Sequence, residues 1–430
     1  MGSNNAFVIH PDVKYAPTSR PADMMLDEAC MLVEAIGLDV VLSETVKISQ
    51  PRAGSFLGKG YADQLAEMAE AYEHPLIVIN TTLSSVQQRN LETLTSCKVI
   101  DRTALILEIF GARAQTHAGR LQVELASLTF QRSRLVRSWT HLERQRGGGG
   151  FLGGPGERQI ELDRRMLMDR VMRIKGELQE VERTRHLQRR NRDRSETPTL
   201  ALIGYTNAGK STLFNKLTGA DVLSKDMLFA TLDPTMRGMK LPSGRRAVLA
   251  DTVGFISQLP TELVEAFKST LEEVVEADIL VHVHDASSPM VAEEYADVCH
   301  VLEELGLDPE MQAERVVHIL NKSDQIDDMA GDTADETREY LQNLLGGGVF
   351  VSALSGAGIN DALLVLDEKI NADDIRLDVV LAPEDGAPRA WLHAHGTVHS
   401  SVFDDVGNET VSLTISIANR NRFASRWPQL

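Results

Sequence analysis

The chain has 430 residues, of which 43% are hydrophobic and 25% are charged, and its formal net charge at pH 7 is −18. These proportions are typical of a folded globular protein and exclude a disordered or collagen-like chain, and the length predicts about two to four domains. No run approaches the roughly 18 apolar residues of a membrane span, and no apolar segment near the N-terminus resembles a secretion signal. The three cysteines, Cys30, Cys97 and Cys299, lie far apart within apolar segments. We therefore expect a cytoplasmic protein without structural disulfides.

Residues 1–118 are predicted to form a small α/β domain. A helical face is predicted from the spacing of Leu26, Ala29, Leu32, Val33 and Ile36. Short apolar runs predict buried strands at residues 40–42, 76–79 and 99–100. The segment Gly58-Lys59-Gly60 opens a further helix but lacks a full phosphate-binding loop, so a plain turn is the better interpretation.

Residues 119–196 are predicted to form an arginine-rich helical hairpin. Between residues 119 and 194 the chain carries 18 Lys and Arg against 10 Asp and Glu, whereas the rest of the chain is strongly acidic. The arginines include Arg132, Arg134, Arg137, Arg144, Arg146, Arg164, Arg165, Arg189 and Arg190. An acidic body with one arginine-rich projection predicts a protein that is steered onto RNA or DNA. The alternative is a solvated hairpin stabilised by ion pairs such as Glu161–Arg165.

The helical pattern of this segment breaks at residues 147–156. Before the break, leucines recur at helical spacing, at Leu121, Leu125, Leu128, Leu135 and Leu142. After it, apolar residues do the same, at Ile160, Leu162, Met166, Leu167, Val171 and Ile174. The break holds four consecutive glycines with Phe151 and Leu152, and arginines flank it. Because a merely flexible linker needs no aromatic residue, we predict a binding loop that becomes ordered on its target.

A phosphate-binding loop is predicted at the start of the next domain, residues 197–372. The pattern G-x-x-x-x-G-K-[ST] directly follows the apolar run 200–203 and precedes a helix. It comprises Gly204, Tyr205, Thr206, Asn207, Ala208, Gly209, Lys210 and Ser211, followed by Thr212. In such a loop the backbone N–H groups surround the phosphates, Lys210 reaches the β/γ oxygens, and Ser211 ligates Mg²⁺.

Three later motifs each end an apolar run that is predicted to be a strand. They are Asp251-Thr252-Val253-Gly254, Asn321-Lys322-Ser323-Asp324 and Ser352-Ala353-Leu354. Nucleotide sites in open α/β sheets lie at such strand ends. We therefore expect a P-loop α/β domain, with a mostly parallel sheet and helices on both faces.

The chemistry of these motifs predicts that the nucleotide is GTP. Asp251 can hold the Mg²⁺ water shell, and the Gly254 N–H can meet the γ-phosphate. The Asp324 carboxylate can accept from N1–H and N2–H₂ of guanine, a donor pair that adenine lacks. Asn321 is expected to help read the base, and the backbone N–H of Ala353 to meet guanine O6.

A switch segment is predicted between the loop and Asp251. It comprises Phe229, Ala230, Thr231, Leu232 and Asp233. Thr231 is expected to close over the γ-phosphate and complete the Mg²⁺ shell. Ser211 and Thr231 are therefore the predicted metal ligands, and Lys210, Thr231 and Gly254 the predicted catalytic residues.

The residue after Gly254 is Phe255, where Ras-type GTPases place a water-orienting glutamine. A phenyl ring can neither position nor deprotonate water. Turnover is therefore expected to be slow, with the missing group supplied by a partner or by another part of the chain. Asn207 has two open interpretations: its amide oxygen helps to bind a charge-stabilising K⁺, or its own hydrogen bonds shape the loop.

Residues 373–430 are predicted to form a small α+β domain with strands at residues 377–381 and 411–417. Histidines cluster here, at His393, His395 and His399, and in the preceding domain at His282 and His284. No cysteine or carboxylate spacing supports a metal site. Alternating strand positions are the better explanation of both groups.

Four segments resemble the HflX family of bacterial GTPases. They are the loop at 204–211, Phe229-Ala230-Thr231-Leu232-Asp233, Asp251-Thr252-Val253-Gly254-Phe255 and Gly153-Gly154-Pro155-Gly156-Glu157. The last is the most specific to the family, because it has no role in GTP binding. The resemblance covers essentially the whole chain, and a hydrophobic residue in the place of Phe255 is also a family trait.

The resemblance implies binding to the large ribosomal subunit, with the hairpin loop reaching toward the peptidyl-transferase region. In that family the GTP-bound form splits stalled or idle ribosomes, often under heat or other stress, and the large subunit stimulates hydrolysis. We expect a monomer away from the ribosome and no membrane partner. Two alternatives are a GTP-dependent assembly factor for the large subunit and a GTP-liganded RNA-binding switch with negligible turnover.

Overall fold

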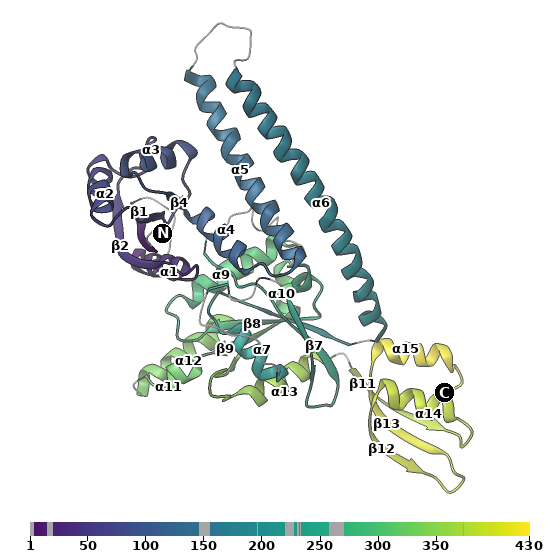
Figure 1. The fold of residues 1–430 in the computed structure, drawn as a ribbon. Coiled ribbons are helices and arrows are strands. Elements are labelled where there is room, and N and C mark those ends of the chain that lie inside the picture. The colour runs from purple at the N-terminus through teal and green to yellow at the C-terminus, as the bar shows by residue number, and fades with distance from the viewer. Residues whose placement is uncertain are drawn as a thin grey trace.

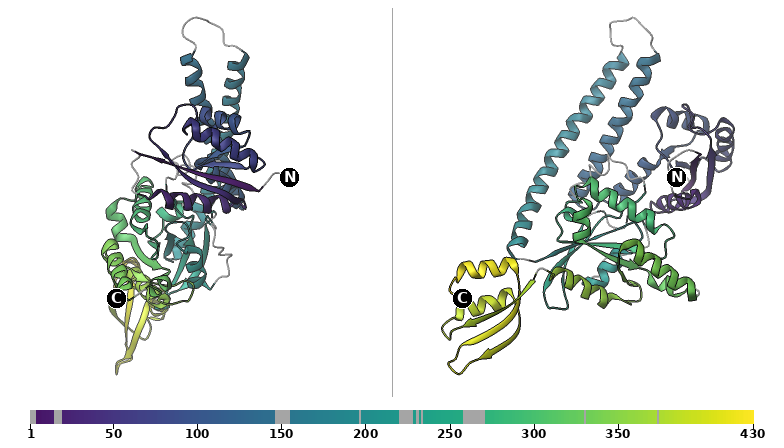
Figure 2. Two further views of the ribbon diagram at one scale, coloured as in Figure 1. Left: turned by 90° about the vertical axis from the view of Figure 1, so that its left-hand side faces the viewer. Right: turned by 180° about the vertical axis from the view of Figure 1, so that it is seen from behind.

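The computed structural model describes residues 4–14, 20–145, 155–195, 197–219, 228–229, 232, 234–257, 271–329, 331–372 and 374–430. The described part of the chain forms three sheets and a long helical hairpin (Figure 1). The hairpin projects from the body of the molecule, and the N-terminal and C-terminal sheets lie on opposite sides of the central sheet (Figures 1 and 2). The predicted class, an α/β protein with a central P-loop sheet, is confirmed.

The N-terminal sheet is parallel throughout, with the order β2-β1-β3-β4. Its strands are β1 (Asn5–Val13), β2 (Asp39–Ile48), β3 (Leu76–Ile79) and β4 (Val99–Asp101). The sequence prediction omitted β1, although it lies between two other strands and buries Phe7 and Val8 on opposite faces. A strand that is buried on both faces has no alternating pattern, and periodicity alone therefore misses it.

Two helices cover each face of this sheet. The helices are α1 (Ala22–Glu34), α2 (Lys59–Ala71), α3 (Ser85–Thr95) and α4 (Arg102–Arg113). Buried residues of α1 and α4 share one core with Val8, and those of α2 and α3 share another with Phe7. Gly58 is the N-cap of α2, as expected for a plain turn.

The helical hairpin consists of α5 (His117–Gln145) and α6 (Pro155–Ser195). The predicted break at 147–156 is two residues too long, because Pro155 and Gly156 belong to α6; proline suits the first turn of a helix, where its missing N–H costs nothing. Residues 146–154, including Arg146, Phe151 and Leu152, lie outside the described residues.

Among the described residues, the buried side chains of the hairpin lie toward its base, and Arg134 of α5 also contacts α3. Leu121, Val171 and Ile174 are buried there. Farther out, Leu162 and Met166 were predicted to share their apolar face but are 54% and 68% exposed. In a two-helix projection, each helix covers only those side chains of the other that face it. Helical spacing does not show how far along the hairpin the rest of the protein covers the remaining side chains.

The central sheet has the order β10-β9-β8-β5-β7-β6, and only the β6–β7 pair is antiparallel. Its strands are β5 (Thr199–Ile203), β6 (Thr235–Lys240), β7 (Arg246–Asp251), β8 (Ile279–Asp285), β9 (Val316–Asn321) and β10 (Val349–Phe350). Its helices are α7 (Lys210–Thr218), α9 (Val291–Glu304), α10 (Pro309–Arg315), α11 (Ser323–Asp327), α12 (Gly331–Leu345) and α13 (Ile359–Ile370). Residues of α7 and α13 pack on one face and residues of α9 on the other, as predicted. All four motifs follow the carboxyl ends of strands.

The C-terminal sheet is antiparallel with the order β11-β13-β12. Its elements are β11 (Asp374–Leu381), α14 (Gly386–His395), β12 (Thr397–Phe403), β13 (Glu409–Ser416) and α15 (Ile417–Arg426). The prediction that His393 and His395 occupy alternating strand positions is wrong, because both lie on α14. There the His395 ring stacks on Trp391, one helical turn away, with ring centroids 4.2 Å apart.

No helix in the described residues is long and apolar enough to cross a membrane. Cys30, Cys97 and Cys299 are free thiols, as predicted.

Candidate nucleotide site

The predicted phosphate-binding loop connects β5 to α7, and two of its glycines are fixed by close contacts. Gly204 and Gly209 have φ angles of 138° and 89°, which L side chains rarely adopt. A Cβ on Gly204 would lie 2.2 Å from the Val283 carbonyl oxygen, and a Cβ on Gly209 would lie 2.1 Å from Asn321 Nδ2. The loop is therefore packed directly against β8 and the end of β9.

Lys210 is buried at the centre of the loop. Its Nζ donates to the carbonyl oxygens of Gly204 at 3.0 Å and Tyr205 at 2.7 Å. Burial lowers its pKa to about 8, although the Asp251 carboxylate acts in the opposite direction. The Lys210 side chain therefore points back into the loop, as the motif predicts for a lysine that meets phosphates.

The carboxyl end of β7 brings oxygen ligands to the same place. Ser211 Oγ donates to Asp251 Oδ2 at 2.7 Å. Oxygen groups suit Mg²⁺, which takes one or two protein ligands and otherwise keeps water and substrate phosphates. The residues present therefore fit this ion. Thr231, the second predicted metal ligand, lies outside the described residues, as do Ala230 and Asp233.

Gly254 and Phe255 close the other side of the loop. Thr206 N–H donates to the Phe255 carbonyl at 2.7 Å, and Phe255 N–H donates to the Gly204 carbonyl at 3.1 Å. A Cβ on Gly254 would lie 2.9 Å from Lys210 Nζ and 2.8 Å from Thr206 Cγ2. The Phe255 side chain is 1% exposed and belongs to the core, so it cannot orient a water molecule at the loop.

Asn321 links the loop to the motif after β10. Its Nδ2 donates to the Ala208 carbonyl at 2.8 Å, and its Oδ1 accepts from Ala353 N–H at 2.9 Å. The amide therefore joins the phosphate and base sides of the site. Since Asn321 already uses the Ala353 N–H, both residues have positioning roles in this arrangement.

The rest of the base motif surrounds the start of α11. Lys322 has a φ of 62°, and its Nζ lies 2.7 Å from Asp285 Oδ2, while Ser323 N–H donates to the Val351 carbonyl at 3.0 Å. These contacts leave Asp324 partly exposed in the first turn of α11. Leu354 is 79% exposed on the neighbouring loop.

Other residues of the predicted nucleotide site lie in the core or at the protein surface. Phe229 and Leu232 are each 2% exposed, and the Phe229 ring meets Phe110 of α4 edge-on at 4.7 Å between centroids. Thr252 Oγ1 donates to the Leu202 carbonyl at 2.5 Å.

Asn207 is exposed with a φ of 63°, and among the described residues its amide has no hydrogen-bond partner. The interpretation that its own hydrogen bonds shape the loop is therefore not supported; its tolerance of positive φ is the observed contribution.

The sequence did not reveal a buried polar network that joins the loop to the N-terminal sheet. Tyr205 Oη donates to Glu28 Oε1 at 2.6 Å and accepts from the Ser257 N–H. Glu28 Oε2 accepts from Arg102 Nη2 at 2.7 Å and Ser257 Oγ at 2.6 Å. Arg102 also donates to Asn80 Oδ1 at 2.8 Å. No motif marks these residues, because they meet only in the folded chain.

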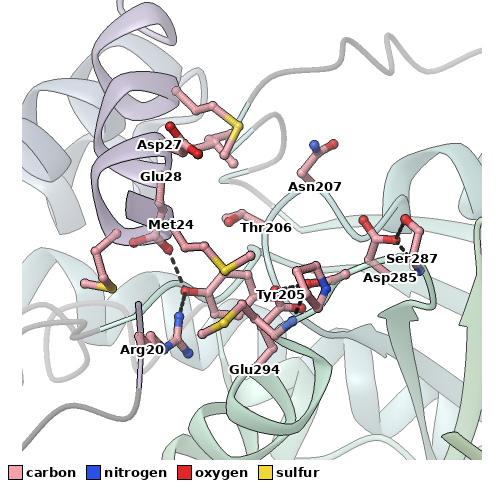
Figure 3. Close-up of a pocket in the computed structure, with 16 residues that line it drawn as sticks. Arg20, Met24, Asp27, Glu28, Tyr205, Thr206, Asn207, Asp285, Ser287 and Glu294 are labelled. Atoms are coloured by element: carbon pink, nitrogen blue, oxygen red, sulfur yellow. Dashed lines mark hydrogen bonds between the residues drawn. The ribbon is translucent and has the colours of Figure 1, made fainter. Parts of the chain in front are cut away.

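A pocket of about 350 Å³ lies beside this network, between α1 and the loop (Figure 3). Tyr205 points from the loop toward Arg20 and Glu28, while Asn207 lies at the pocket's edge (Figure 3). Burial raises the pKa of Glu294, another lining residue, to about 7. The candidate nucleotide site therefore borders a pocket of mixed polar and apolar lining, to which α1 of the N-terminal domain and the phosphate-binding loop both contribute.

Comparisons with known proteins identify the family. Residues 23–111 match the family described as GTP-binding GTPase N-terminal, residues 113–192 its Middle Region, and residues 199–322 the 50S ribosome-binding GTPase family. The GTPase HflX of Magnetococcus marinus is 49% identical over 376 residues, which are 87% of this chain and 84% of that protein. The chain belongs to the HflX family of GTPases. Its activity is GTP hydrolysis.

A second relative and a solved structure were also found. GTPase HflX of Escherichia coli is 40% identical over 405 residues, 94% of this chain and 93% of that protein. A GTP-binding protein from Sulfolobus solfataricus, solved in complex with GDP, is 21% identical, with a TM-score of 0.45, and covers 86% of this chain and 99% of its own.

Nucleotide affinity is expected to fall as pH rises above about 8. In the free protein Lys210 loses its proton through this range, and binding to the phosphates would have to restore it. The affinity should therefore fall by up to about tenfold per pH unit. Titration with a fluorescent GDP analogue from pH 7 to 8.5, below the range in which guanine loses its own N1 proton, measures this. In Lys210→Arg the charge persists, so any remaining affinity should be independent of pH; the same profile in both proteins would contradict the explanation.

Gly254→Ala is expected to lower GTP turnover at least about tenfold while changing GDP affinity less. The added methyl would displace Lys210 and Thr206 at the side of the loop that faces the γ-phosphate. Gly238→Ala on β6 is the matched control, because its Cβ would have no heavy atom within 4 Å. Equal turnover in the two variants would refute the placement of Gly254.

Glu28→Gln is expected to lower the free energy of unfolding by about 3 kcal/mol, because it leaves the buried Arg102 guanidinium without its counter-charge. Asp27→Asn removes the same charge from an exposed position on the same helix and should have little effect. Urea unfolding measures both. A similar loss in the two variants would show that Glu28 acts only through net charge.

Proposed function

We propose that GTP and Mg²⁺ bind at the carboxyl edge of the central sheet through the residues that the motifs predict. Lys210 and the loop N–H groups would take the β/γ-phosphates, and Ser211 with Thr231 would ligate Mg²⁺, which neutralises phosphate charge when bound. The support is the placement of Lys210, Ser211, Asp251 and Gly254 within contact of one another.

Asp324 is proposed as the group that selects guanine. It is partly exposed at the start of α11, whereas the Asn321 amide is engaged by Ala208 and Ala353. A carboxylate at this place can pair with two adjacent guanine donors. Asn321 would then act indirectly, by holding the loops on either side of the base.

Hydrolysis is proposed to be slow until a partner completes the site. The Phe255 ring is buried in the core and offers no group for the attacking water. Lys210 and the Gly254 N–H would stabilise charge on the γ-phosphate while water attacks in line. The accelerating group would come from the ribosome, from K⁺ held by Asn207, or from both. The exposed amide of Asn207 at the edge of the loop is compatible with the K⁺ interpretation.

The partner is proposed to be the large ribosomal subunit, which the hairpin would contact. Arg164, Arg165, Arg173 and Arg183 are exposed along α6, on a projection from an otherwise acidic protein. This is the observation that carries the proposal, because exposed arginines on a projection suit ribosomal RNA. By contrast, Arg170 pairs with Glu124 through two hydrogen bonds, and Arg134 turns back to Gln88 of α3. The description of the matching family as 50S ribosome-binding GTPases agrees with this partner.

In the GTP-bound state the protein is proposed to split stalled or idle ribosomes under stress. The hairpin would bind the large subunit. It would separate the two subunits only if the protein binds the large subunit more tightly when the small subunit is absent. GTP would set that difference, and hydrolysis would release the protein.

Purified large subunits are expected to raise steady-state GTP turnover in K⁺ buffer by tenfold or more, equivalent to about 1.4 kcal/mol of barrier lowering. Arg164→Glu combined with Arg165→Glu should abolish this stimulation and preserve intrinsic turnover. Lys47→Glu combined with Lys98→Glu makes the same charge change on the N-terminal sheet, where both lysines are exposed, and is the control.

Sedimentation of intact ribosomes with the protein and GTP would then show separated subunits. Stimulation by precursor particles alone would favour the assembly role. Nucleotide-dependent RNA binding without stimulated turnover would favour the RNA-binding switch, and both results would contradict ribosome splitting.

A further inference from the structure

Three histidines meet under α9 on one face of the central sheet. His282 and His284 alternate along β8 and therefore point to the same face, and His318 of β9 is the register partner of His282. One ring nitrogen from each side chain can be chosen so that all lie within 4.8 Å of one another. From the sequence alone, His282 and His284 were explained by alternating strand positions, and His318 was not grouped with them.

These imidazoles carry no charge at neutral pH; His282 and His284 are buried, and His318 is half-buried. His282 is 2% and His284 4% exposed. Burial lowers the pKa of His282 well below its ordinary value, that of His284 to about 3 and that of His318 to about 4, and the neighbouring imidazoles act in the same direction on His282 and His284. Each ring therefore keeps an unprotonated nitrogen, which is the form that binds metals.

The hydrogen bonding of the cluster is incomplete. His284 Nε2 and His318 Nδ1 lie 3.0 Å apart and share one hydrogen bond. His282 has no hydrogen-bond partner among the described residues, and the Tyr295 ring of α9 packs against all three imidazoles at 5.7 to 5.9 Å between centroids. A metal ion would therefore accept a lone pair from the His282 ring without displacing a protein hydrogen bond of that ring.

We propose that His282, His284 and His318 bind a divalent transition metal ion of the Zn²⁺ class. Tetrahedral zinc with nitrogen ligands at about 2.0–2.1 Å places those nitrogens roughly 3.3 Å apart. The observed spacing, from 3.0 Å for one pair to at most 4.8 Å, is close to this value. The His282 and His284 rings, whose centroids lie 3.9 Å apart, would have to rotate so that their lone pairs meet at the ion. Imidazole ligands favour Zn²⁺, Co²⁺, Ni²⁺ or Cu²⁺ over Mg²⁺ and Ca²⁺. Three protein ligands leave the fourth position to water.

The position of the cluster gives the ion a structural consequence for the nucleotide site. Val283, between the two β8 histidines, carries the carbonyl that packs on Gly204, and β9 ends at Asn321. An ion that joins β8 to β9 would hold together the strands that support the phosphate loop and the base motif. Binding is therefore expected to stabilise the folded protein by mass action.

The test uses the untagged 430-residue chain, stripped of metal with a chelator and titrated with Co²⁺. We expect about one Co²⁺ per chain, the visible absorption of a tetrahedral site, its displacement by Zn²⁺, and a rise in melting temperature with either ion but not with Mg²⁺. His318→Asn and His284→Leu should each weaken Co²⁺ binding by about 100-fold or more, since loss of an outer-sphere partner alone costs 10–100-fold. His399→Gln removes an exposed histidine of the C-terminal sheet and should leave binding unchanged.

X-ray absorption of the zinc-loaded wild-type protein counts the histidine ligands directly, so the conclusion does not depend on the folding of a variant. Three nitrogen ligands from imidazole would support the site. Absence of Co²⁺ binding, binding that the His318 and His284 variants retain, or a ligand set without histidine would overturn it and leave a neutral core cluster.

Discussion

The buried ion pair between Arg102 and Glu28 is the centre of the hydrogen-bond network through which the N-terminal domain meets Tyr205 and Ser257 of the GTPase domain. Arg102 begins α4 and Glu28 lies on α1, and their atoms are 2.7 Å apart. Burial alone would raise the pKa of Glu28, but the Arg102 charge and the hydrogen bonds from Ser257 and Tyr205 hold it below its ordinary value. Because a buried charge is stable only when it is paired and hydrogen-bonded, these groups permit little other placement of the two units.

This constraint extends into the nucleotide site. Tyr205 belongs to the phosphate-binding loop, and Ser257 follows Gly254 by three residues, so the carboxylate of Glu28 contacts both segments that border Lys210. On the opposite side, Asn321 joins the same loop to the base motif. The site is thus held from two directions, and the glycines at 204, 209 and 254 are required because backbone and side chains approach too closely for a Cβ.

The arginines of the hairpin and the histidines of the central sheet suit different binding partners. On α6 the charged arginines are exposed, and their long-range attraction for phosphate can act before contact. Beneath α9, His282 and His284 are buried and His318 is half-buried, and all three are neutral, so they offer lone pairs rather than charge. The first arrangement suits a large polyanionic partner, and the second suits a small cation.

The sequence by itself determined the elements whose signals are local. The loop at 204–211 and the strand ends at Asp251, Asn321 and Ser352 were predicted because each motif follows an apolar run, and parallel strands bring their carboxyl ends to one edge. The two long helices were predicted because helical spacing persists over many turns. The tertiary structure alone decided the rest. The strand β1 carries no alternating pattern, α14 was mistaken for a strand, and the exposure of Leu162 and Met166 depends on where the supporting body ends. Glu28, Arg102 and Tyr205, like His282 and His318, meet across long stretches of chain. Their contacts arise from packing and desolvation, which no spacing along the sequence encodes.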